Sequence, residues 1–101
     1  MIVAGEEKRR NFREAGWWGD QTLADLFFAN ATKHPERLTL IDAPNRPDFA
    51  FGAPRRLTYA QMREEVERFA GALLAAGIGK DDVIVIQLPN MTEFVSLYFA
   101  A

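Results

Sequence analysis

Cysteine is absent from the 101-residue sequence, and histidine occurs only once, at position 34. The lack of cysteine excludes disulfide bonds, thiolate catalysis and cysteine-based metal sites. His34 has no second histidine and no pair of carboxylates at ligand spacing, so a zinc site is not expected there. We expect His34 instead to stabilise the C-terminus of a helix electrostatically. The sequence therefore predicts no metal-binding residues.

An excess of charge of one sign is also lacking. Acidic and basic residues are interleaved along the chain, and the formal net charge is −2. The one basic cluster, residues 8–10, follows Glu6 and Glu7, which favours a solvated surface over a phosphate-binding patch. This balance predicts no nucleic-acid partner and no binding to an anionic membrane.

Long hydrophobic runs and glycine-rich loops are missing as well. Gln87, Asn90 and Glu93 interrupt the apolar stretches near the end of the sequence, which are too short for a membrane span. Neither the P-loop pattern nor the dinucleotide-binding pattern of glycines occurs. These patterns point to no catalytic, cofactor-binding or substrate-binding residue in this chain, and the cytoplasm is the expected location.

Hydrophobic residues make up 49% of the sequence, enough to build the core of one small domain. Residues 1–20 are charged and lead into Trp17 and Trp18. We expect an irregular N-terminal arm whose two tryptophans dock on a larger body, because no basic groove accompanies them as in a base-stacking site. Residues 21–101 are then predicted to begin a larger domain.

The first predicted helix begins after Thr22, which is a favourable N-cap, and ends before Pro35, which cannot continue the hydrogen-bond ladder. Residues 38–41 predict a short strand. Residues 42–55 contain three prolines and predict a long loop. Residues 56–57 are expected to return as a paired strand, so that the whole segment forms a wide hairpin.

The second predicted helix has the clearest signals. Thr58 and Gln61 fit a capping box, and Gly77 is expected to end the helix as a C-cap glycine. One apolar face is expected to carry Met62, Val66, Phe69, Ala70, Leu73 and Leu74. The solvated face is expected to carry Glu64, Glu65 and Glu67, which do not form a catalytic pair.

Residues 83–88 are apolar at consecutive positions, which is typical of a strand buried on both faces of a parallel sheet. A third helix is expected from Met91 onward. Asn90 has two interpretations: it caps this helix, or it lies with Pro89 near a ligand at the carboxyl end of the strand. The cap is the favoured interpretation.

The third predicted helix is apolar nearly all round, including Phe94, Tyr98 and Phe99, and such a helix must be enclosed by protein. These aromatic residues could line an acyl pocket, but their helical spacing beside a buried strand favours ordinary core. A doubly buried strand likewise needs parallel neighbours that these residues do not supply. We therefore expect an α/β fold that this chain begins and does not complete, with self-association as the competing explanation.

Four segments in a fixed order carry a family resemblance: RLTYAQM at 56–62, GALLAAGI at 71–78, GKDD at 79–82 and VIVIQLPN at 83–90. This order resembles the opening of AMP-forming acyl-CoA synthetases and related acid ligases of the adenylate-forming superfamily. The resemblance extends upstream to Thr22 and covers nearly all of residues 20–101. Asp81 departs from it, because glycine is commoner at that position of the turn.

The resemblance implies the N-terminal part of the large domain of the adenylate-forming fold. It implies a full-length parent that uses ATP and Mg²⁺ to convert a carboxylic acid into an acyl-adenylate, and coenzyme A to form a thioester. The catalytic residues of that family lie downstream, so this chain alone is predicted to be inactive. Its partner would be the remainder of the synthetase chain. The arm resembles that of ligases for medium-chain, alicyclic or aromatic acids.

A second function stays open from the sequence. The chain could be a stand-alone α/β interaction or dimerisation module without enzymatic activity, in which residues 83–88 and 94–101 form a homodimer interface. The sequence does not distinguish the acid substrate, nor an acceptor that is coenzyme A from one that is a carrier protein.

Overall fold

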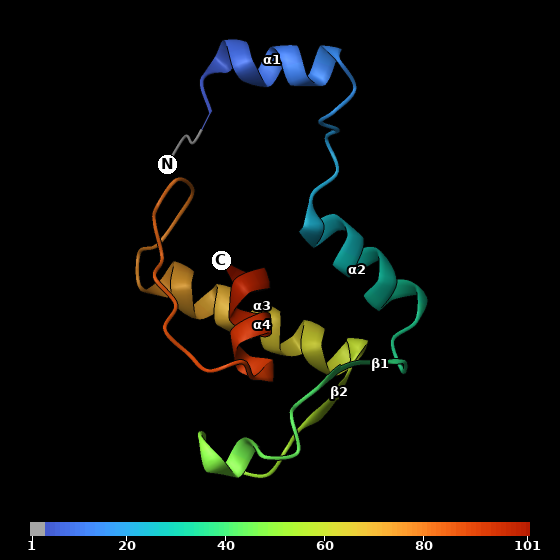
Figure 1. The fold of residues 1–101 in the computed structure, drawn as a ribbon, viewed down its shortest axis with the longest axis vertical. Coiled ribbons are helices and arrows are strands. Elements are labelled where there is room, and N and C mark those ends of the chain that lie inside the picture. Colours follow the sequence, from blue (N-terminus) through green and yellow to red (C-terminus); the bar gives the residue numbers. More distant parts are fainter. Residues whose placement is uncertain (1–3) are drawn as a thin grey trace.

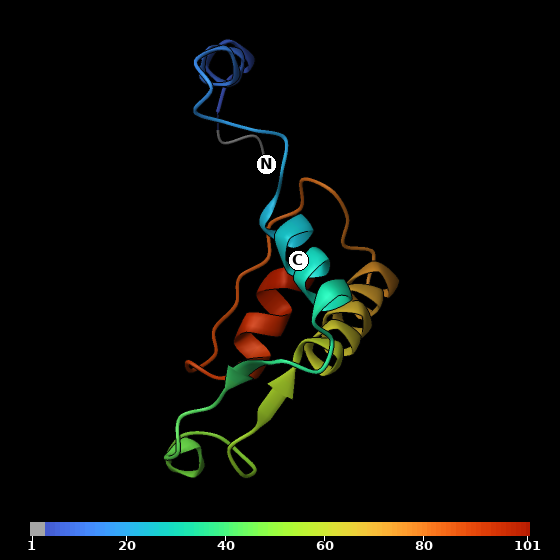
Figure 2. The same cartoon turned by 90° about the vertical axis from the view of Figure 1, so that its right-hand side faces the viewer.

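A computed structural model describes residues 4–101. The elements are α1 (Glu6–Glu14), α2 (Leu23–Lys33), β1 (Leu38–Ile41), the 3-10 helix η1 (Arg46–Asp48), β2 (Arg56–Thr58), α3 (Tyr59–Ala75) and α4 (Thr92–Ala100). Figures 1 and 2 show α1 standing apart at one end of the molecule, joined by an extended linker to a body made of the other elements. The mixture of helices with a small sheet agrees with the predicted α/β class.

The N-terminal segment differs from the predicted irregular arm, because residues 6–14 form a helix. Two glutamates in its first turn and an arginine in its last turn complement the helix dipole. Residues 1–3 of the predicted arm lie outside the described part of the chain.

Trp17 and Trp18 pack on the helix that precedes them. The backbone amides of both residues donate to the Phe12 carbonyl oxygen. Their rings lie 5.5 Å and 5.0 Å from the Phe12 ring, centroid to centroid. The Trp17 side chain stays 74% exposed. The prediction that these tryptophans dock on a larger body is therefore not what the described residues show.

The starts of α2 and α3 confirm the sequence prediction. Thr22 accepts a hydrogen bond from the Asp25 amide, and the Asp25 side chain accepts one from the Thr22 amide, which completes a capping box. Thr58 and Gln61 make the same pair of bonds at the start of α3. Each box satisfies two backbone amides that the helix itself cannot pair. The expected stop before Pro35 is also confirmed, since α2 ends at Lys33 with His34 as its C-cap.

The end of α3 confirms the predicted role of Gly77, which has a φ of 83°. The Gly77 amide donates to the Leu74 carbonyl and the Ile78 amide donates to the Leu73 carbonyl, both at 3.0 Å. These are the two bonds of a Schellman motif, which needs a left-handed residue directly after the C-cap.

Gly77→Ala should lower the free energy of unfolding by about 1–2 kcal/mol, because alanine is strained in the left-handed region. A Cβ atom at Gly77 would meet no atom within 4 Å, so the cost would come from the backbone alone. Gly71→Ala is the matched control: it also meets no atom within 4 Å, but it lies inside α3. That control should gain about 0.5–1 kcal/mol. Urea unfolding followed by circular dichroism measures both, and equal changes would contradict the assignment.

The hairpin is confirmed, with β1 and β2 antiparallel and Ile41 opposite Arg56. The register shifts between Leu38 and Leu40, which marks a bulge or irregularity. The loop between the strands, residues 42–55, contains η1, which the sequence analysis did not predict. Pro47 lies inside this short helix, at a position where its missing amide costs no hydrogen bond.

The core lies where α2, α3 and α4 meet. Phe27, Met62 and Val66 form its buried centre, and Phe99 of α4 packs on Phe27 with a ring distance of 5.0 Å. This contact confirms the core interpretation for Phe99. Tyr98 directly precedes Phe99 in α4 and is 55% exposed, so the core interpretation does not extend to it.

Residues 83–88 do not form the predicted doubly buried strand. The segment is not assigned to a strand, and within residues 4–101 the only strand pairing is between β1 and β2. Ile84 and Ile86 are partly buried, whereas Val83 and Val85 are 65% and 87% exposed. A strand is defined by the neighbour that pairs with its backbone, and the described residues supply no such neighbour.

The turn before this segment accommodates one departure from the family resemblance. Asp81 has a φ of 72°, the left-handed region that glycine adopts without strain. Aspartate is among the few other residues that tolerate this conformation. The surface turn therefore accepts Asp81.

Candidate functional site

A cluster of five charged side chains lies where the loop of residues 42–55 meets α3 and α4. We call it the charged cluster. Its members are Asp42, Arg46, Arg55, Glu65 and Glu93. Burial of charges is unfavourable unless each is paired and hydrogen bonded, so a cluster of this kind is expected to be fully connected.

Asp42 is the most deeply placed member, with a side chain only 1% exposed. Its Oδ1 accepts from the Thr92 amide at 2.8 Å, at the start of α4. Its Oδ2 accepts from the Arg55 amide at 2.9 Å and from Arg46 Nη1 at 2.6 Å. Asp42 follows β1 directly, so one carboxylate joins the hairpin, its loop and α4.

Arg46 binds Glu93 through a two-pronged contact. Arg46 Nη1 donates to Glu93 Oε2 at 2.8 Å and Nη2 donates to Oε1 at 2.7 Å. Arg46 Nε donates to the Phe51 carbonyl at 3.2 Å, so the guanidinium also closes its own loop. Bidentate arginine–carboxylate pairs are strong and geometrically specific. The Arg46 side chain is only 5% exposed, which strengthens the interaction further.

Arg55 extends the cluster to α3. It forms an ion pair with Glu65, and its Nη1 lies 2.9 Å from Glu93 Oε1. The expectation that Glu65 belongs to a solvated helix face is therefore wrong, because its side chain is 6% exposed. Glu64 and Glu67 are exposed as expected, and Glu67 pairs with Arg63 on the surface. Glu65 differs from Glu64 and Glu67 in burial because the tertiary structure places Arg55 against it.

The cluster holds both central carboxyl groups ionised. The Arg46 hydrogen bonds are the main cause that lowers the pKa of Glu93, from 4.5 to about 2. Burial by itself would raise the pKa of Asp42, but the Arg55 and Thr92 amides and the Arg46 guanidinium hold that pKa below its ordinary value. The hydrogen bonds that Arg46 donates to Glu93 and Asp42 raise the pKa of Arg46 in return.

The start of α4 corrects the prediction for Asn90. The N-cap of α4 is Met91, and no side chain makes a local cap hydrogen bond there. Asp42 binds the Thr92 amide instead, from far away in the sequence. Asn90 is exposed and lines an open hollow of about 330 Å³ together with Ile41. The favoured cap interpretation of Asn90 is thus wrong.

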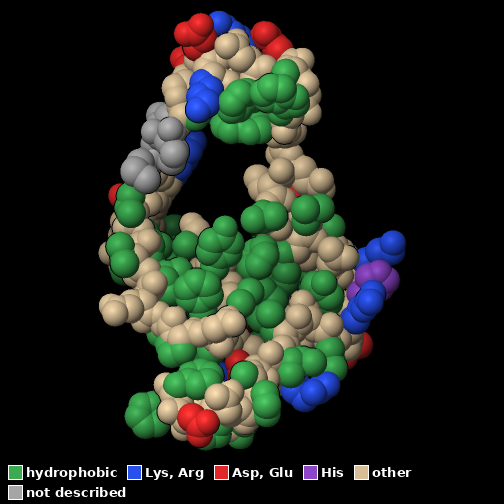
Figure 3. Space-filling model, in the orientation of Figure 1, with side chains coloured by type: hydrophobic (Ala, Val, Ile, Leu, Met, Phe, Trp, Pro, Cys, Tyr) green, Lys and Arg blue, Asp and Glu red, His purple; other side chains and the backbone are tan. Residues whose placement is uncertain are grey.

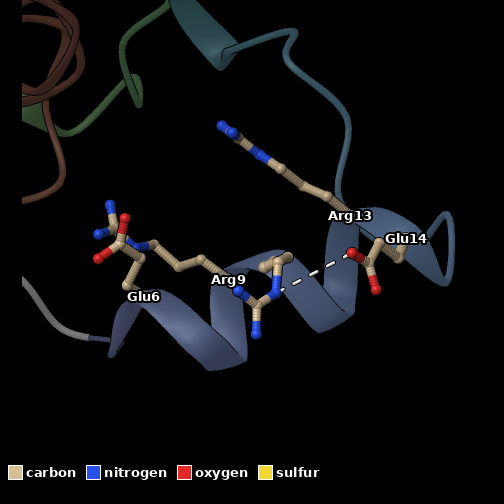
Figure 4. A pocket seen from close by; sticks show the side chains of 5 residues that line it. Glu6, Arg9, Arg13 and Glu14 are labelled. Carbon is tan, nitrogen blue, oxygen red and sulfur yellow. Dashed lines mark ion pairs between the residues drawn. The ribbon is translucent and has the colours of Figure 1, made fainter.

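A second hollow, of about 310 Å³, lies beside α1. Figure 4 shows that Glu6, Arg9, Arg13 and Glu14 all project from this one helix, with Arg13 extending away from it. Arg13 lies 3.4 Å from Asp20, and both side chains are largely exposed. Exposed side chains of a single helix do not enclose a ligand, so this hollow agrees with the solvated surface predicted for the basic cluster.

An apolar surface covers one face of the body. Figure 3 shows hydrophobic side chains spread over this face across α2 and α4. An open hollow of about 210 Å³ lies among α2, β1, α3 and α4, lined mainly by apolar side chains such as Leu23, Leu26 and Val95. Leu23 is 59% exposed and Leu26 is 46% exposed. Exposed apolar area of this extent is typical of a contact surface.

Membrane-spanning helices and metal-binding clusters are both absent from the described residues. Among residues 4–101, no helix is long and apolar enough to cross a bilayer. Over the same residues, no group of three or more histidine, cysteine, aspartate or glutamate side chains is placed to hold a metal ion. The absence of catalytic and binding residues in this chain stays a prediction.

The charged cluster was missed by the sequence analysis because its partners are far apart in sequence. Asp42 and Arg46 are four residues apart and both lie in the proline-containing loop, which is the one local signal. Nothing local connects Arg46 to Glu93, which lies 47 positions further along.

Comparison with known proteins assigns the chain to a family. Residues 27–101 match the family model of the AMP-binding enzymes. The chain is 35% identical to pyochelin synthase PchD of Pseudomonas aeruginosa over 91 residues, and 33% identical to the medium-chain fatty-acid–CoA ligase of Escherichia coli over 99 residues. It is also 33% identical to a salicyl-AMP ligase / salicyl-S-ArCP synthetase of Mycobacterium tuberculosis over 94 residues.

These alignments cover 90%, 98% and 93% of this chain respectively. They cover only 15% or 16% of the length of each relative. The resemblance found in the sequence is thereby confirmed at the level of the family. The chain belongs to the family of AMP-binding enzymes.

Proposed function

We propose that this chain is the N-terminal part of the large domain of an ATP-dependent carboxylic acid ligase that forms an acyl-adenylate. The observation that carries the proposal is the family match over residues 27–101, with relatives that are named ligases and synthases. The described mixture of helices and a hairpin is compatible with the edge of a larger α/β domain.

The proposed reaction joins a carboxylate to the α-phosphate of ATP with release of pyrophosphate, and then transfers the acyl group to a thiol with release of AMP. Medium-chain or aromatic acids are the proposed substrate class, because the relatives include a medium-chain fatty-acid ligase and a salicyl-AMP ligase. Coenzyme A is the proposed acceptor. A carrier protein is the alternative acceptor, since one relative is named a salicyl-S-ArCP synthetase.

The proposal places the binding of ATP and Mg²⁺ outside this chain. It is supported by the ion pairs that Asp42, Glu65 and Glu93 already form with arginines. The role of this chain in the proposed enzyme is therefore structural: it supplies helices, a hairpin and an extended apolar segment against which the catalytic part is built. ATP, Mg²⁺ and coenzyme A would bind residues beyond the present sequence.

The apolar surface and residues 83–88 are the proposed contact with the remainder of the ligase polypeptide. Val83 and Val85 expose most of their surface, and the segment is not paired into a sheet. The relatives are more than six times as long as the part that aligns, so they contain ample protein to cover such a surface. A second copy of this chain is the competing occupant. The cytoplasmic location and the boundary at residue 20 stay predictions.

Expression of the complete reading frame that contains this sequence tests the proposal. We expect exchange of pyrophosphate into ATP that depends on Mg²⁺ and on a medium-chain or aromatic acid. Addition of coenzyme A should then release AMP if the acceptor is coenzyme A. The 101-residue chain alone should show no exchange, because no glycine-rich phosphate-binding pattern occurs in its sequence.

Two outcomes would contradict the proposal. Exchange by the pure 101-residue chain would show that its catalytic machinery had been missed. A stop codon directly after codon 101, together with a stable dimer in sedimentation that is independent of concentration, would favour the interaction module instead.

A further inference from the structure

Asp42 caps the start of α4 although it lies outside that helix and far from it in sequence. The Asp42 Oδ1 accepts from the Thr92 amide at 2.8 Å across 50 positions of sequence. Met91, the residue at the N-cap position, makes no side-chain cap bond. The start of α4 is therefore located by the hairpin rather than by its own sequence.

Hydrogen bonds fix both the backbone amide and the carboxylate of Asp42. Its amide donates to the Arg55 carbonyl at 2.9 Å, and its carboxylate accepts from the Arg55 amide and from Arg46. Arg46 in turn grips Glu93 on the first turn of α4 through two hydrogen bonds. A side chain whose own position is fixed by additional hydrogen bonds can hold its partner in a precise position.

The contacts of Asp42 and Arg46 position residues 89–91, which connect the extended residues 83–88 to α4. Asn90 is exposed there and lines the open hollow of about 330 Å³ beside Asp42 and Ala43. In open α/β sheets, ligands bind beyond the carboxyl ends of strands. If residues 83–88 join the sheet of the proposed ligase, this junction lies at its ligand edge.

We propose that Asp42 is a positioning residue of that ligand edge: it holds the start of α4 and the 89–91 junction against the hairpin loop without touching the substrate. The proposal rests on the proposed function. Displacement of about 1 Å at a reacting centre can cost as much as a hundredfold in rate. Loss of the Asp42 contact to Thr92 should therefore slow adenylation even in molecules that remain folded.

The test uses the complete ligase and the variant Asp42→Ala, with Asp48→Ala as the matched control. Asp48 is an exposed aspartate of the same loop. The burst of acyl-adenylate counts the folded active sites, and kcat of adenylation is expressed per burst-titrated site. We expect a fall of about tenfold or more for Asp42→Ala and less than about twofold for Asp48→Ala.

A second variant keeps the proposal testable if Asp42→Ala does not fold. Thr92→Pro removes the amide that Asp42 binds, while proline suits the first position of a helix and Met91 already has the extended backbone that precedes proline. This variant should show a comparable loss of kcat per site.

A merely structural role would lower the burst amplitude but leave kcat per site unchanged, and that result for both variants would overturn the proposal. A wild-type ligase without any acid-dependent exchange would instead overturn the proposed function, and the positioning role with it. If the wild type is active and both variants keep its kcat per site, the positioning role is wrong while the proposed function stands.

Discussion

Arg46→Met should lower the free energy of unfolding by about 3–5 kcal/mol, the cost of removing one partner from a buried ion pair. The guanidinium of Arg46 is 5% exposed and makes close contacts with both Asp42 and Glu93. Methionine fills much of the same volume but leaves two carboxylates without their main cation. A loss of this size is a large fraction of the stability of a small domain.

Arg63→Met is the matched control, because Arg63 also pairs with a glutamate at 2.8 Å but on the surface. Exposed pairs contribute about 1 kcal/mol or less, so this variant should unfold nearly as the wild type does. Urea unfolding followed by circular dichroism measures both proteins. Equal losses for the two variants would show that the Arg46 contacts carry no special stability.

A double variant separates the ion pair from other effects of the substitution. Arg46→Met combined with Glu93→Gln removes both charges of the central pair. The combined loss should be smaller than the sum of the single losses by about 0.5–3 kcal/mol, because the two side chains contact each other directly. Simple additivity would argue that methionine at position 46 acts through packing and not through charge.

Stability should fall steeply between pH 4.5 and pH 2. The folded pKa of Glu93 is about 2, below the ordinary value of 4.5, with hydrogen bonds from Arg46 as the first cause. A group with a lowered folded pKa contributes stability that is fully present above its unfolded pKa. That contribution is lost as the pH falls through the folded pKa. For Glu93 it amounts to at most about 3 kcal/mol.

The pKa of Asp42 is shifted in the same direction, so its protonation adds to the acid loss. Urea midpoints measured at steps from pH 6 to pH 2 give the slope of stability against pH. Glu93→Gln is less stable at neutral pH, but its stability should depend less on pH between 4.5 and 2. An unchanged slope in this variant would show that Glu93 is not the main titrating group.

Local signals in the sequence were sufficient for the boundaries of α2 and α3. Thr22 and Thr58 cap helices through residues three positions away, and Gly77 ends α3 through bonds within its own last turn. The hairpin was equally accessible, because the apolar strand at 38–41 and the prolines after it act locally. In the two helices the interacting groups lie within a few residues of one another, whereas the hairpin pairs residues as far apart as Leu38 and Thr58.

Three errors share the opposite property. Glu65 was assigned to the solvated face of α3, but Arg55 reaches it from the loop. Asn90 was assigned the cap of α4, but Asp42 takes that role across 50 positions. Residues 83–88 were assigned to a buried strand, but their pairing depends on a neighbour that the described residues do not contain.

By itself, then, the sequence determined the family, the α/β class and the ends of the capped helices, because ordered short motifs and local hydrogen bonds carry that information. Only the tertiary structure decided which charges are buried. Each member of the charged cluster is an ordinary solvated residue until the loop of residues 42–55 lies against α3 and α4. Burial then removes water from these charges, and most of the partners that replace it, such as Glu93 for Arg46, are distant in sequence.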